Sequence, residues 1–504
     1  MAAFAERLKE AMELKGLKQA DVIRLAQPFG EPVGIRIGKS HMSQYVSGKT
    51  EPRRDILKVL AQALEVDYLW LEGDDVAMTA DSHPAKEQQS KNSWSIGEDG
   101  MRTFNKSSKL DNVLYDVRGP VVEEAKRMED AGMHVLKLNI GNPAPFGFRT
   151  PEEVIFDMRQ QLTECEGYSD SKGLFSARKA IMQYAQLKNL PNVTINDIYT
   201  GNGVSELINL SMQALLDEGD EILIQDPQWL NYVAQVKYCN GTAVRVPTDI
   251  AHNFEMQGET IEDLISPRTK AIMINTPNNP TGCVMSEDSL YRIAEIAVKH
   301  DLLVISDDVY NTLIYDGAAA PLIAAFPHMR ERTVIVNSFS KSFAMTGWRI
   351  GFVAGPAEIV DRMTKCQENF NACANSVGQY ACAVALDHPE LSDMICKTFA
   401  DRRSVLLKGL KHIEGIKCNC PRGAFYVFAD ISSFGLTSAE FCNRLLDEEK
   451  VVCIPGSAFG TCGEGFIRIA YTCAEEDLNK AILRIQRFCK KLSEKRADIT
   501  TNSG

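Results

Sequence analysis

The chain has 504 residues and a net charge of −12, and 44% of its residues are hydrophobic and 24% charged. This length allows two or three domains, and the composition is typical of a globular protein. The negative net charge argues against nonspecific binding of polyanions by the whole chain, although a local basic surface remains possible. The sequence shows neither a signal peptide nor an apolar run of about 18 residues, so we expect a cytoplasmic protein.

The 14 cysteines begin at Cys165, and only Cys418 and Cys420 lie close together. A C-x-C pair without matching His or Cys residues is poor spacing for zinc, and a charged chain of this size does not need disulfides. We therefore expect small buried hydrophobic residues and no metal site.

Composition divides the chain into four segments. Residues 1–75 carry apolar stripes at helical spacing, which predict an all-α domain of short helices. Residues 76–105 are polar without periodicity and are expected to form a flexible linker. Residues 106–490 alternate short apolar runs with amphipathic stretches, and residues 491–504 are expected to be a disordered tail.

Four apolar runs in the long segment predict a buried sheet. "DEILIQDP", "TKAIMINTP", "DLLVISDD" and "RTVIVNSF" are rich in Ile and Val and end in polar turns. Between two of them, "SEDSLYRIAEIAVKHD" places Leu290, Ile293, Ile296 and Ala297 at helical spacing. Runs that are apolar on both faces and separated by helices indicate an α/β fold with a mostly parallel sheet covered on both sides. Such sheets bind ligands at the carboxyl ends of their strands.

The residues that follow the strands share one chemistry. Asn279 lies in "TPNNPTG", Asp307 and Tyr310 lie in "DDVY", and Lys341 lies in "SFSKSFAMTGWRIG". Upstream, "YTGNGVSELINL" is a glycine-containing turn that enters a helix, where backbone amides and the helix dipole favour a phosphate. A strand-end lysine, an acid, an amide, a phenol and a phosphate site are the parts needed to bind pyridoxal 5'-phosphate.

Each expected role follows from the chemistry of this cofactor. Lys341 is expected to bind it covalently and then to act as general acid and base at the substrate's α-carbon. Asp307 would keep the pyridine nitrogen protonated, while Asn279 and Tyr310 would hydrogen-bond the phenolate oxygen of the ring. The expected phosphate ligands are Gly203, Val204, Ser338 and Arg349.

A further arginine lies in the apolar stretch "EGFIRIAYT". An arginine within a buried strand must meet an anion, because an unpaired buried charge is costly. We expect Arg468 to bind the substrate α-carboxylate through a two-pronged contact.

"TPNNPTG", "DDVY" and "SFSKSFAMTGWRIG" together make residues 106–490 resemble the class I pyridoxal phosphate aminotransferases of fold type I. The resemblance implies a large doubly wound domain with a mostly parallel sheet, followed by a small α+β domain. It also implies that Trp229 stacks on the pyridine ring and that the backbone of Gly141 touches the substrate. Tyr168 would reach the cofactor phosphate of a neighbouring subunit, which implies an obligate homodimer with shared active sites.

Within this family, "SSKLDNVLYDVRGPVVEEAKRMEDAGMHVLKLNIGNPAPFGF" is similar to the bacterial glutamate-pyruvate (alanine) aminotransferases. This likeness points to alanine or a similar amino acid and to 2-oxoglutarate as substrates. It adds Tyr115 and Arg118 to Gly141, Asn279 and Arg468 as candidate substrate contacts. The stretch around Lys341, however, is closer to the aspartate-type subgroup, and Trp229 stands where the alanine enzymes are expected to have tyrosine.

Residues 1–75 resemble the repressor-type helix-turn-helix domains, with "LKQADVIRLA" as the first helix of the motif and "GKSHMSQYVSGKTEP" as the recognition helix. The expected DNA contacts are Gln19, Ser40, His41, Ser43 and Gln44. Residues 34–58 are locally basic, since Arg36, Lys39, Lys49, Arg53, Arg54 and Lys58 oppose only Glu51 and Asp55. A helical protein-interaction module is the alternative interpretation of this segment.

Three functions fit these features. The first is a working aminotransferase with an attached module that binds double-stranded DNA. The second is a transcriptional regulator whose aminotransferase-like domain senses an amino acid or the cofactor. The third is a carbon-sulfur lyase of the same fold, which would use the same lysine for elimination. The first is favoured because every expected chemical position is filled.

Overall fold

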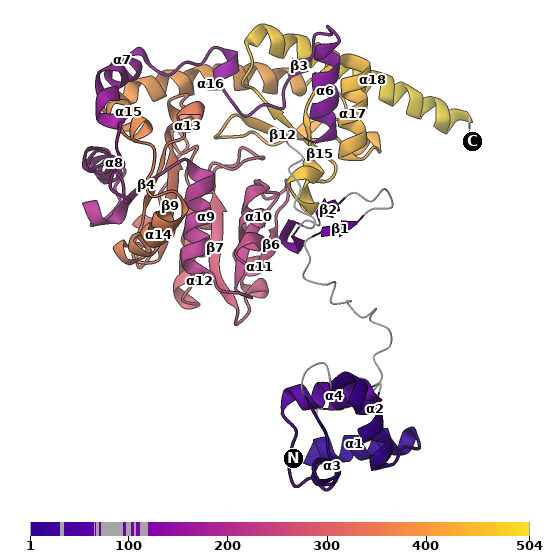
Figure 1. Ribbon diagram of the computed structural model, residues 1–504. Coiled ribbons are helices and arrows are strands. Elements are labelled where there is room, and N and C mark those ends of the chain that lie inside the picture. The colour runs from indigo at the N-terminus through magenta and orange to yellow at the C-terminus, as the bar shows by residue number, and fades with distance from the viewer. Residues whose placement is uncertain are drawn as a thin grey trace. The chain divides into compact units, whose positions relative to one another are not determined.

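The computed structural model describes residues 2–30, 35–64, 66, 70–71, 94–96, 102–104, 107–110 and 119–502. The chain forms two compact units, Met1–Ser107 and Ser108–Gly504 (Figure 1). No helix in these described ranges combines the length and apolar character that crossing a bilayer requires. The candidate substrate contacts Tyr115 and Arg118 lie outside the described residues.

The described residues of the first unit form helices and one antiparallel pair of strands. They are α1 (Ala2–Leu14), α2 (Gln19–Gly30), α3 (Lys39–Val46), α4 (Arg54–Leu64), β1 (Trp94–Ile96) and β2 (Arg102–Phe104). The helical core includes Phe4, Leu8, Val22 and Leu60 from the apolar stripes of the sequence. It also includes Met42 and Tyr45 on the inner side of α3.

Two details differ from the sequence predictions. The first helix of the motif, expected in "LKQADVIRLA", ends later than predicted, because α2 continues through Gly30. A Cβ on Gly30 would lie 2.4 Å from the carbonyl oxygen of Ile35, so only glycine allows this close approach of the backbone. The expected linker 76–105 is also not wholly irregular, since β1 and β2 pair within it. Three-residue strands are too short for their alternation to stand out in a sequence.

The second unit is built on a seven-stranded sheet in the order β4-β10-β9-β8-β7-β5-β6. Its strands are β4 (Ile198–Gly201), β5 (Glu221–Asp226), β6 (Thr242–Pro247), β7 (Thr269–Asn275), β8 (Leu303–Asp307), β9 (Thr333–Ser338) and β10 (Gly351–Ala354). Within this sheet β10 runs in the opposite direction to the other six strands. The four predicted strands are β5, β7, β8 and β9, which lie side by side, and the mostly parallel sheet is confirmed.

Helices cover both faces of this sheet, and α9 and α12, labelled near β7 in Figure 1, pack on opposite faces. They are α7 (Glu152–Gln161), α8 (Phe175–Leu187), α9 (Val204–Leu215), α10 (Asn231–Tyr238), α11 (Gly258–Leu264), α12 (Glu287–Lys299), α14 (Ala357–Phe370) and α15 (Ser376–Asp387). Successive residues of β5 point to opposite sides, because Ile222 and Ile224 pack with α9 while Leu223 packs with α12. This double burial explains why the strands read as continuous apolar runs.

A smaller α+β part completes the second unit. Its antiparallel sheet contains β11 (Lys417–Cys418), β12 (Tyr426–Asp430), β15 (Phe466–Ala470) and β14 (Ile454–Pro455), in that order. A parallel pair joins β3 (Leu136–Lys137) to β13 (Val451–Val452). The accompanying helices are α6 (Pro120–Asp130), α16 (Pro389–Leu410), α17 (Ser438–Glu449) and α18 (Glu475–Asn502).

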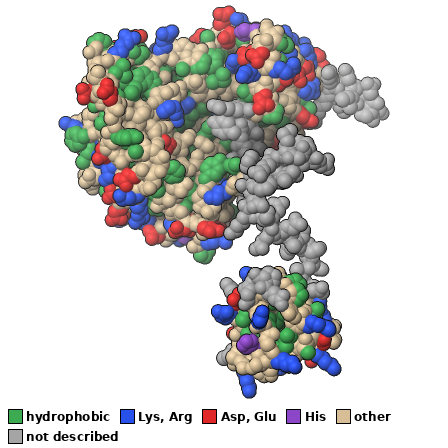
Figure 2. Space-filling model, viewed as in Figure 1, with side chains coloured by type: hydrophobic (Ala, Val, Ile, Leu, Met, Phe, Trp, Pro, Cys, Tyr) green, Lys and Arg blue, Asp and Glu red, His purple; other side chains and the backbone are tan. Residues whose placement is uncertain are grey.

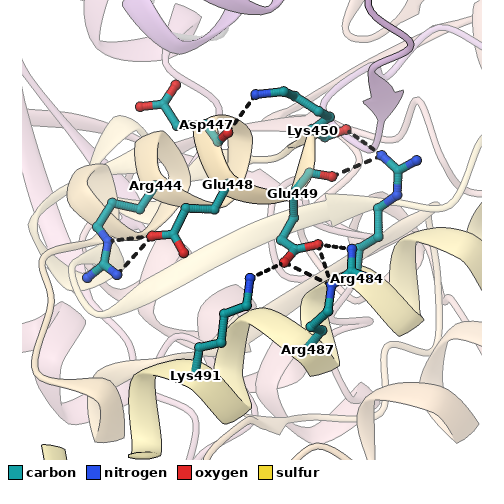
Figure 3. A network of polar contacts seen from close by, with 8 residues as sticks. All are labelled: Arg444, Asp447, Glu448, Glu449, Lys450, Arg484, Arg487 and Lys491. Carbon is teal, nitrogen blue, oxygen red and sulfur yellow. Dashed lines mark hydrogen bonds and ion pairs between the residues drawn. The ribbon is translucent and has the colours of Figure 1, made fainter. Parts of the chain in front are cut away.

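The last helix corrects the predicted disordered tail. Residues from 491 onward were expected to be irregular, but α18 continues to Asn502. Leu492 is buried in the core of the smaller part, and Lys491 donates to the Glu449 carboxylate at 2.9 Å. Figure 3 shows Arg487 and Lys491 of α18 converging on Glu449 at the end of α17. These tertiary contacts anchor the first residues of the segment whose polar composition suggested a tail.

All 14 cysteines lie in the described part of the chain and have free thiols. Cys283, Cys382, Cys442, Cys453, Cys473 and Cys489 are buried, whereas Cys420 is exposed. The prediction of small buried residues is therefore confirmed for part of the set only.

Candidate active site

One cavity of about 860 Å³ lies where the strand ends of the large sheet meet the smaller part of the unit. Asp307 and Ser338 stand at the carboxyl ends of β8 and β9, and Arg468 comes from β15. Ten expected site residues line the cavity: Gly141, Val204, Trp229, Asn279, Asp307, Tyr310, Ser338, Lys341, Arg349 and Arg468. Residues separated by more than 300 positions in the sequence thus face one space.

Lys341 stands at the centre of this group. The short helix α13 (Phe339–Ser342) follows β9 directly, and Lys341 Nζ donates to the carbonyl oxygen of Gly141 at 2.6 Å. Burial, reinforced by the positive charges of Arg468 and Arg349, lowers the pKa of Lys341 to about 8. An amine with this pKa is partly neutral near pH 7, and a neutral amine is a nucleophile and a base.

Asp307 is the acid of the cavity and is only 3% exposed. Burial raises its pKa to about 6, although the hydroxyl of Tyr232 donates to it at 2.7 Å and opposes this rise. A buried carboxylate of this kind is stabilised by a cation placed opposite it. The protonated nitrogen of a pyridine ring is such a cation.

Arg468 is held at the cavity wall by two hydrogen bonds. Its Nη1 donates to Asn279 Oδ1 at 2.9 Å, and its Nη2 donates to the Asn139 carbonyl oxygen at 2.9 Å. The ring of Tyr426 lies against the guanidinium, with Cζ 4.5 Å from the ring centroid. The guanidinium is therefore oriented within the cavity lining, and a carboxylate that enters meets a fixed cation.

A cradle for an anion lies at the start of α9. Gly203 precedes the helix with φ 94°, and a Cβ there would lie 2.5 Å from Arg349 Nη2. Arg349 itself has φ 53° in the left-handed region, and Asn375 Nδ2 donates to its carbonyl oxygen at 2.9 Å. A side chain on Gly203 would fill the space in which helix amides and a guanidinium can meet a phosphate.

The lysine, the acid and the anion cradle together fit pyridoxal 5'-phosphate. The anion cradle suits its phosphate, the buried carboxylate of Asp307 suits its protonated ring nitrogen, and the partly neutral amine of Lys341 suits its aldehyde. Trp229 is half-buried and lines the same cavity as Asp307 with an aromatic side chain. The residues present therefore suit this cofactor on chemical grounds.

Several lining residues were missed by the sequence analysis. Asn275 links two strand ends, because its Nδ2 donates to the Asp307 carbonyl oxygen and its Oδ1 accepts from the Asn279 N–H, both at 2.9 Å. Tyr232 follows Trp229 by three residues, a spacing that could have indicated a shared side of a helical turn. Tyr426 lies in an apolar strand, where no sequence pattern sets it apart.

Some expected residues are not brought to the cavity in the single chain. Tyr168 is 90% exposed and does not belong to the lining. Gly203 also lies outside the lining and contributes through its proximity to Arg349. Tyr115 and Arg118 fall on residues that are not described.

The first unit is described separately. On α3 the side chains of Lys39, Ser40, His41 and Ser43 are exposed. Gln44 is half-buried and accepts a hydrogen bond from Thr50 at 3.3 Å. Figure 2 shows Lys and Arg side chains distributed over the visible face of this unit. Gln19, at the start of α2, is half-buried.

Comparison with known proteins gives the family. Residues 133–485 match the family model for aminotransferase class I and II. The chain is 39% identical to the glutamate-pyruvate aminotransferase AlaA of Haemophilus influenzae over 404 residues, which cover 77% of this chain and 98% of the relative. It is 36% identical to the alanine aminotransferase of Mycobacterium bovis, over 77% of this chain and 93% of the relative. A crystal structure of an aminotransferase from Escherichia coli matches with a TM-score of 0.73 and 38% identity, over 77% of this chain and 98% of that chain. The protein is an aminotransferase that uses pyridoxal 5'-phosphate and belongs to the class I and II family.

Proposed function

We propose that the protein transfers an amino group between alanine, or a similar amino acid, and 2-oxoglutarate. The relatives named for glutamate-pyruvate and alanine transamination support this substrate pair. The observation that carries the proposal is the placement of the Lys341 amine in one cavity with Asp307 and Arg468. An acid, a base and a carboxylate-binding cation are then available at a single substrate position.

Each residue of the cavity has a separate role in the proposed reaction. Bound pyridoxal 5'-phosphate supplies an electron sink for charge that develops at the substrate's α-carbon. Arg468, oriented by Asn279, binds the α-carboxylate and places the α-carbon, with the Gly141 backbone as a further substrate contact. Lys341 first holds the cofactor and then moves a proton at the α-carbon. Asp307 keeps a proton on the ring nitrogen, so that the ring accepts negative charge.

Other residues bind the cofactor without taking part in proton transfer. Trp229 would stack on the ring, and Tyr310 and Asn279 would hydrogen-bond its phenolate oxygen. The phosphate would be held by Ser338, Arg349 and the amides of Gly203 and Val204. The exposed Tyr168 would complete the phosphate site of a second subunit in a homodimer, and Tyr115 and Arg118 would contact the substrate side chain.

A substrate panel tests this proposal. With alanine and 2-oxoglutarate, we expect the purified holoenzyme to form pyruvate and glutamate in equal amounts. Formation of pyruvate and ammonia from cystathionine, without transfer to 2-oxoglutarate, would instead identify a carbon-sulfur lyase. Bound cofactor with no turnover of any amino acid in the panel would identify a sensor.

We propose DNA binding as a second function of the first unit. The observation that favours it is the outer side of α3, where Lys39, Ser40, His41 and Ser43 are exposed while Met42 and Tyr45 are buried. Phosphate contacts by basic side chains make binding weaken steeply with salt. We expect deletion of residues 1–107 to abolish binding to duplex DNA and to leave transamination intact. Salt-independent binding, or binding that survives the deletion, would refute this function.

A further inference from the structure

A buried tyrosine joins the two sides of the cavity. Tyr426 begins β12 and is 2% exposed, and it lines the cavity together with Tyr310 and Arg468. In the small sheet Tyr426 lies opposite Ala470, and Phe428 lies opposite Arg468. Because alternate residues of a strand share a face, Tyr426 and Arg468 lie diagonally on one face.

Each end of the Tyr426 side chain has a specific neighbour. Its hydroxyl lies 3.0 Å from the hydroxyl of Tyr310, and the two rings meet edge to face at 83°. Its ring lies against the Arg468 guanidinium, with Cζ 4.5 Å from the centroid. A Cβ on Gly141 would lie 2.5 Å from the Tyr426 hydroxyl. Glycine at position 141 therefore leaves room for this hydroxyl.

We propose that Tyr426 is a positioning residue that couples the cofactor-facing phenol of Tyr310 to the carboxylate-binding guanidinium of Arg468. This inference rests on the proposed roles of those two residues. When the Tyr310 hydroxyl donates a hydrogen bond to the cofactor's phenolate oxygen, the Tyr310 oxygen is free to accept a hydrogen bond from the Tyr426 hydroxyl. A hydroxyl that accepts one hydrogen bond donates a stronger one, so Tyr426 strengthens the hydrogen bond that Tyr310 makes.

Burial raises the pKa of Tyr310 well above its ordinary value, so this hydroxyl stays protonated and remains a donor. The Tyr426 ring acts separately, because an aromatic face attracts the guanidinium and restricts its orientation. The hydroxyl should therefore influence the cofactor, and the ring should influence substrate binding. Two substitutions at one position separate these effects.

The first measurement is the pH midpoint at which the visible absorbance of the protein-bound cofactor changes, with no substrate present. Tyr426→Phe keeps the ring and removes the hydroxyl, and we expect it to raise this midpoint by about 0.5, the size of one net hydrogen bond. The KM for the amino acid should stay within about twofold, because the cation–π contact is retained. Tyr426→Leu should produce the same rise in midpoint and should increase the KM about fivefold as well.

The controls show whether Tyr426 acts through Tyr310. Tyr471→Phe removes another buried hydroxyl, which donates to the Ala424 carbonyl oxygen at 3.2 Å outside the cavity lining, and should leave the midpoint unchanged. In the Tyr310→Phe background, adding Tyr426→Phe should produce no further rise. An unchanged midpoint in Tyr426→Phe, or an equal rise in both backgrounds, overturns the coupling while leaving the role of Tyr310 intact. No rise in Tyr310→Phe alone overturns this inference together with the proposed role of Tyr310.

Discussion

Two buried ionisable side chains of the cavity have pKa values shifted in the directions that an aminotransferase site requires. Burial lowers the pKa of Lys341 to about 8 and raises that of Asp307 to about 6. Each shift makes the group depend on an oppositely charged partner that a bound cofactor can supply. Asp308, beside Asp307 but outside the cavity lining, has its pKa raised by burial to about 7.

Replacement of Lys341 by alanine tests the attachment of the cofactor. We expect Lys341→Ala to lose the visible absorbance of covalently bound cofactor and about 10³-fold or more of transaminase activity, because both covalent attachment and proton transfer are lost. Lys365→Ala on α14, where the lysine pairs only with the nearby Glu368 among the described contacts, should change neither property. Retention of the absorbance in Lys341→Ala would refute the assignment.

Replacement of Asp308 by asparagine tests the pH dependence of stability. An unfolded aspartate releases its proton near pH 4, whereas native Asp308 keeps its proton to about pH 7. Between about pH 4 and pH 7 the native protein therefore binds one more proton than the unfolded protein. The unfolding free energy of the wild type consequently decreases as the pH rises through this range. Relative to Asp308→Asn, the cofactor-free wild type should lose about 3 kcal/mol of unfolding free energy between pH 4 and pH 8. The exposed Asp393→Asn variant should follow the wild type, and a flat difference for Asp308→Asn would contradict the shifted pKa.

At the scale of elements, the residues of the site lie at the ends of helices and strands. The strands β8 and β9 deliver Asp307 and Ser338, α13 delivers Lys341, and the start of α9 provides the anion cradle. The four predicted strands are confirmed because double burial imposes a continuous apolar run on the sequence. The hairpin of β1 and β2 and the last turns of α18 had no comparable signal.

Substitution of Gly203 tests the cradle. A Cβ at this position would lie 2.5 Å from Arg349 Nη2, so Gly203→Ala should displace the guanidinium and weaken pyridoxal 5'-phosphate binding about 10- to 100-fold. Gly219→Ala is a matched control, because Gly219 has a similar φ of 88° and its Cβ would meet nothing within 4 Å. Equilibrium titration of the cofactor-free proteins measures both affinities. Equal affinities for the two variants would refute the cradle, because only Gly203→Ala places a Cβ against Arg349.

Substitution of Glu449 tests the attachment of α18 to α17. Hydrogen bonds from Arg487 and Lys491 lower the pKa of Glu449, so its contribution to stability is present above its ordinary pKa and is lost as the pH falls. Glu449→Gln should lower the unfolding free energy by about 1–2 kcal/mol at pH 7, because the carboxylate is buried. Glu448→Gln removes the neighbouring, more exposed pair with Arg444 and should cost at most about 0.5 kcal/mol. Denaturant unfolding compares the two, and similar losses would mean that burial of Glu449 adds nothing.

At the scale of the whole molecule, the family match covers the second unit, and the first unit stands before it in the chain. The cavity of the single chain lacks Tyr168, which is exposed on its surface. The proposed homodimer would place Tyr168 of the partner subunit at the phosphate. Each active site would then need two chains.

Mixed dimers test this sharing directly. Tyr168→Ala and Lys341→Ala should each impair activity, but a hybrid of the two has one site with an intact Lys341 and an intact Tyr168. Random exchange of subunits should therefore restore about a quarter of the wild-type activity. A mixture of Lys341→Ala and Arg468→Ala should restore none, because these residues belong to the same chain's cavity. No recovery in the first mixture, after exchange is verified, would refute a shared site.

Much of the cavity could be predicted from local sequence because its residues directly follow strands. "DDVY" and "SFSKSF" place Asp307, Tyr310 and Lys341 by short-range geometry, and a parallel sheet brings such strand ends to one edge. Tyr426 and Asn139 could not be predicted in this way. They reach the cavity only when the smaller part of the unit packs against the strand ends.

The sequence alone determined the α/β class, the four strands of the large sheet and the cofactor chemistry, since these depend on periodicity and on residues adjacent to strand ends. Tertiary structure decided the contacts between segments far apart in the chain: Tyr426 with Tyr310 and Arg468, Tyr232 with Asp307, and α18 with Glu449. The physical reason is that a hydrogen bond or ring contact depends on distance in space, whereas a sequence pattern records only the requirements of the local element.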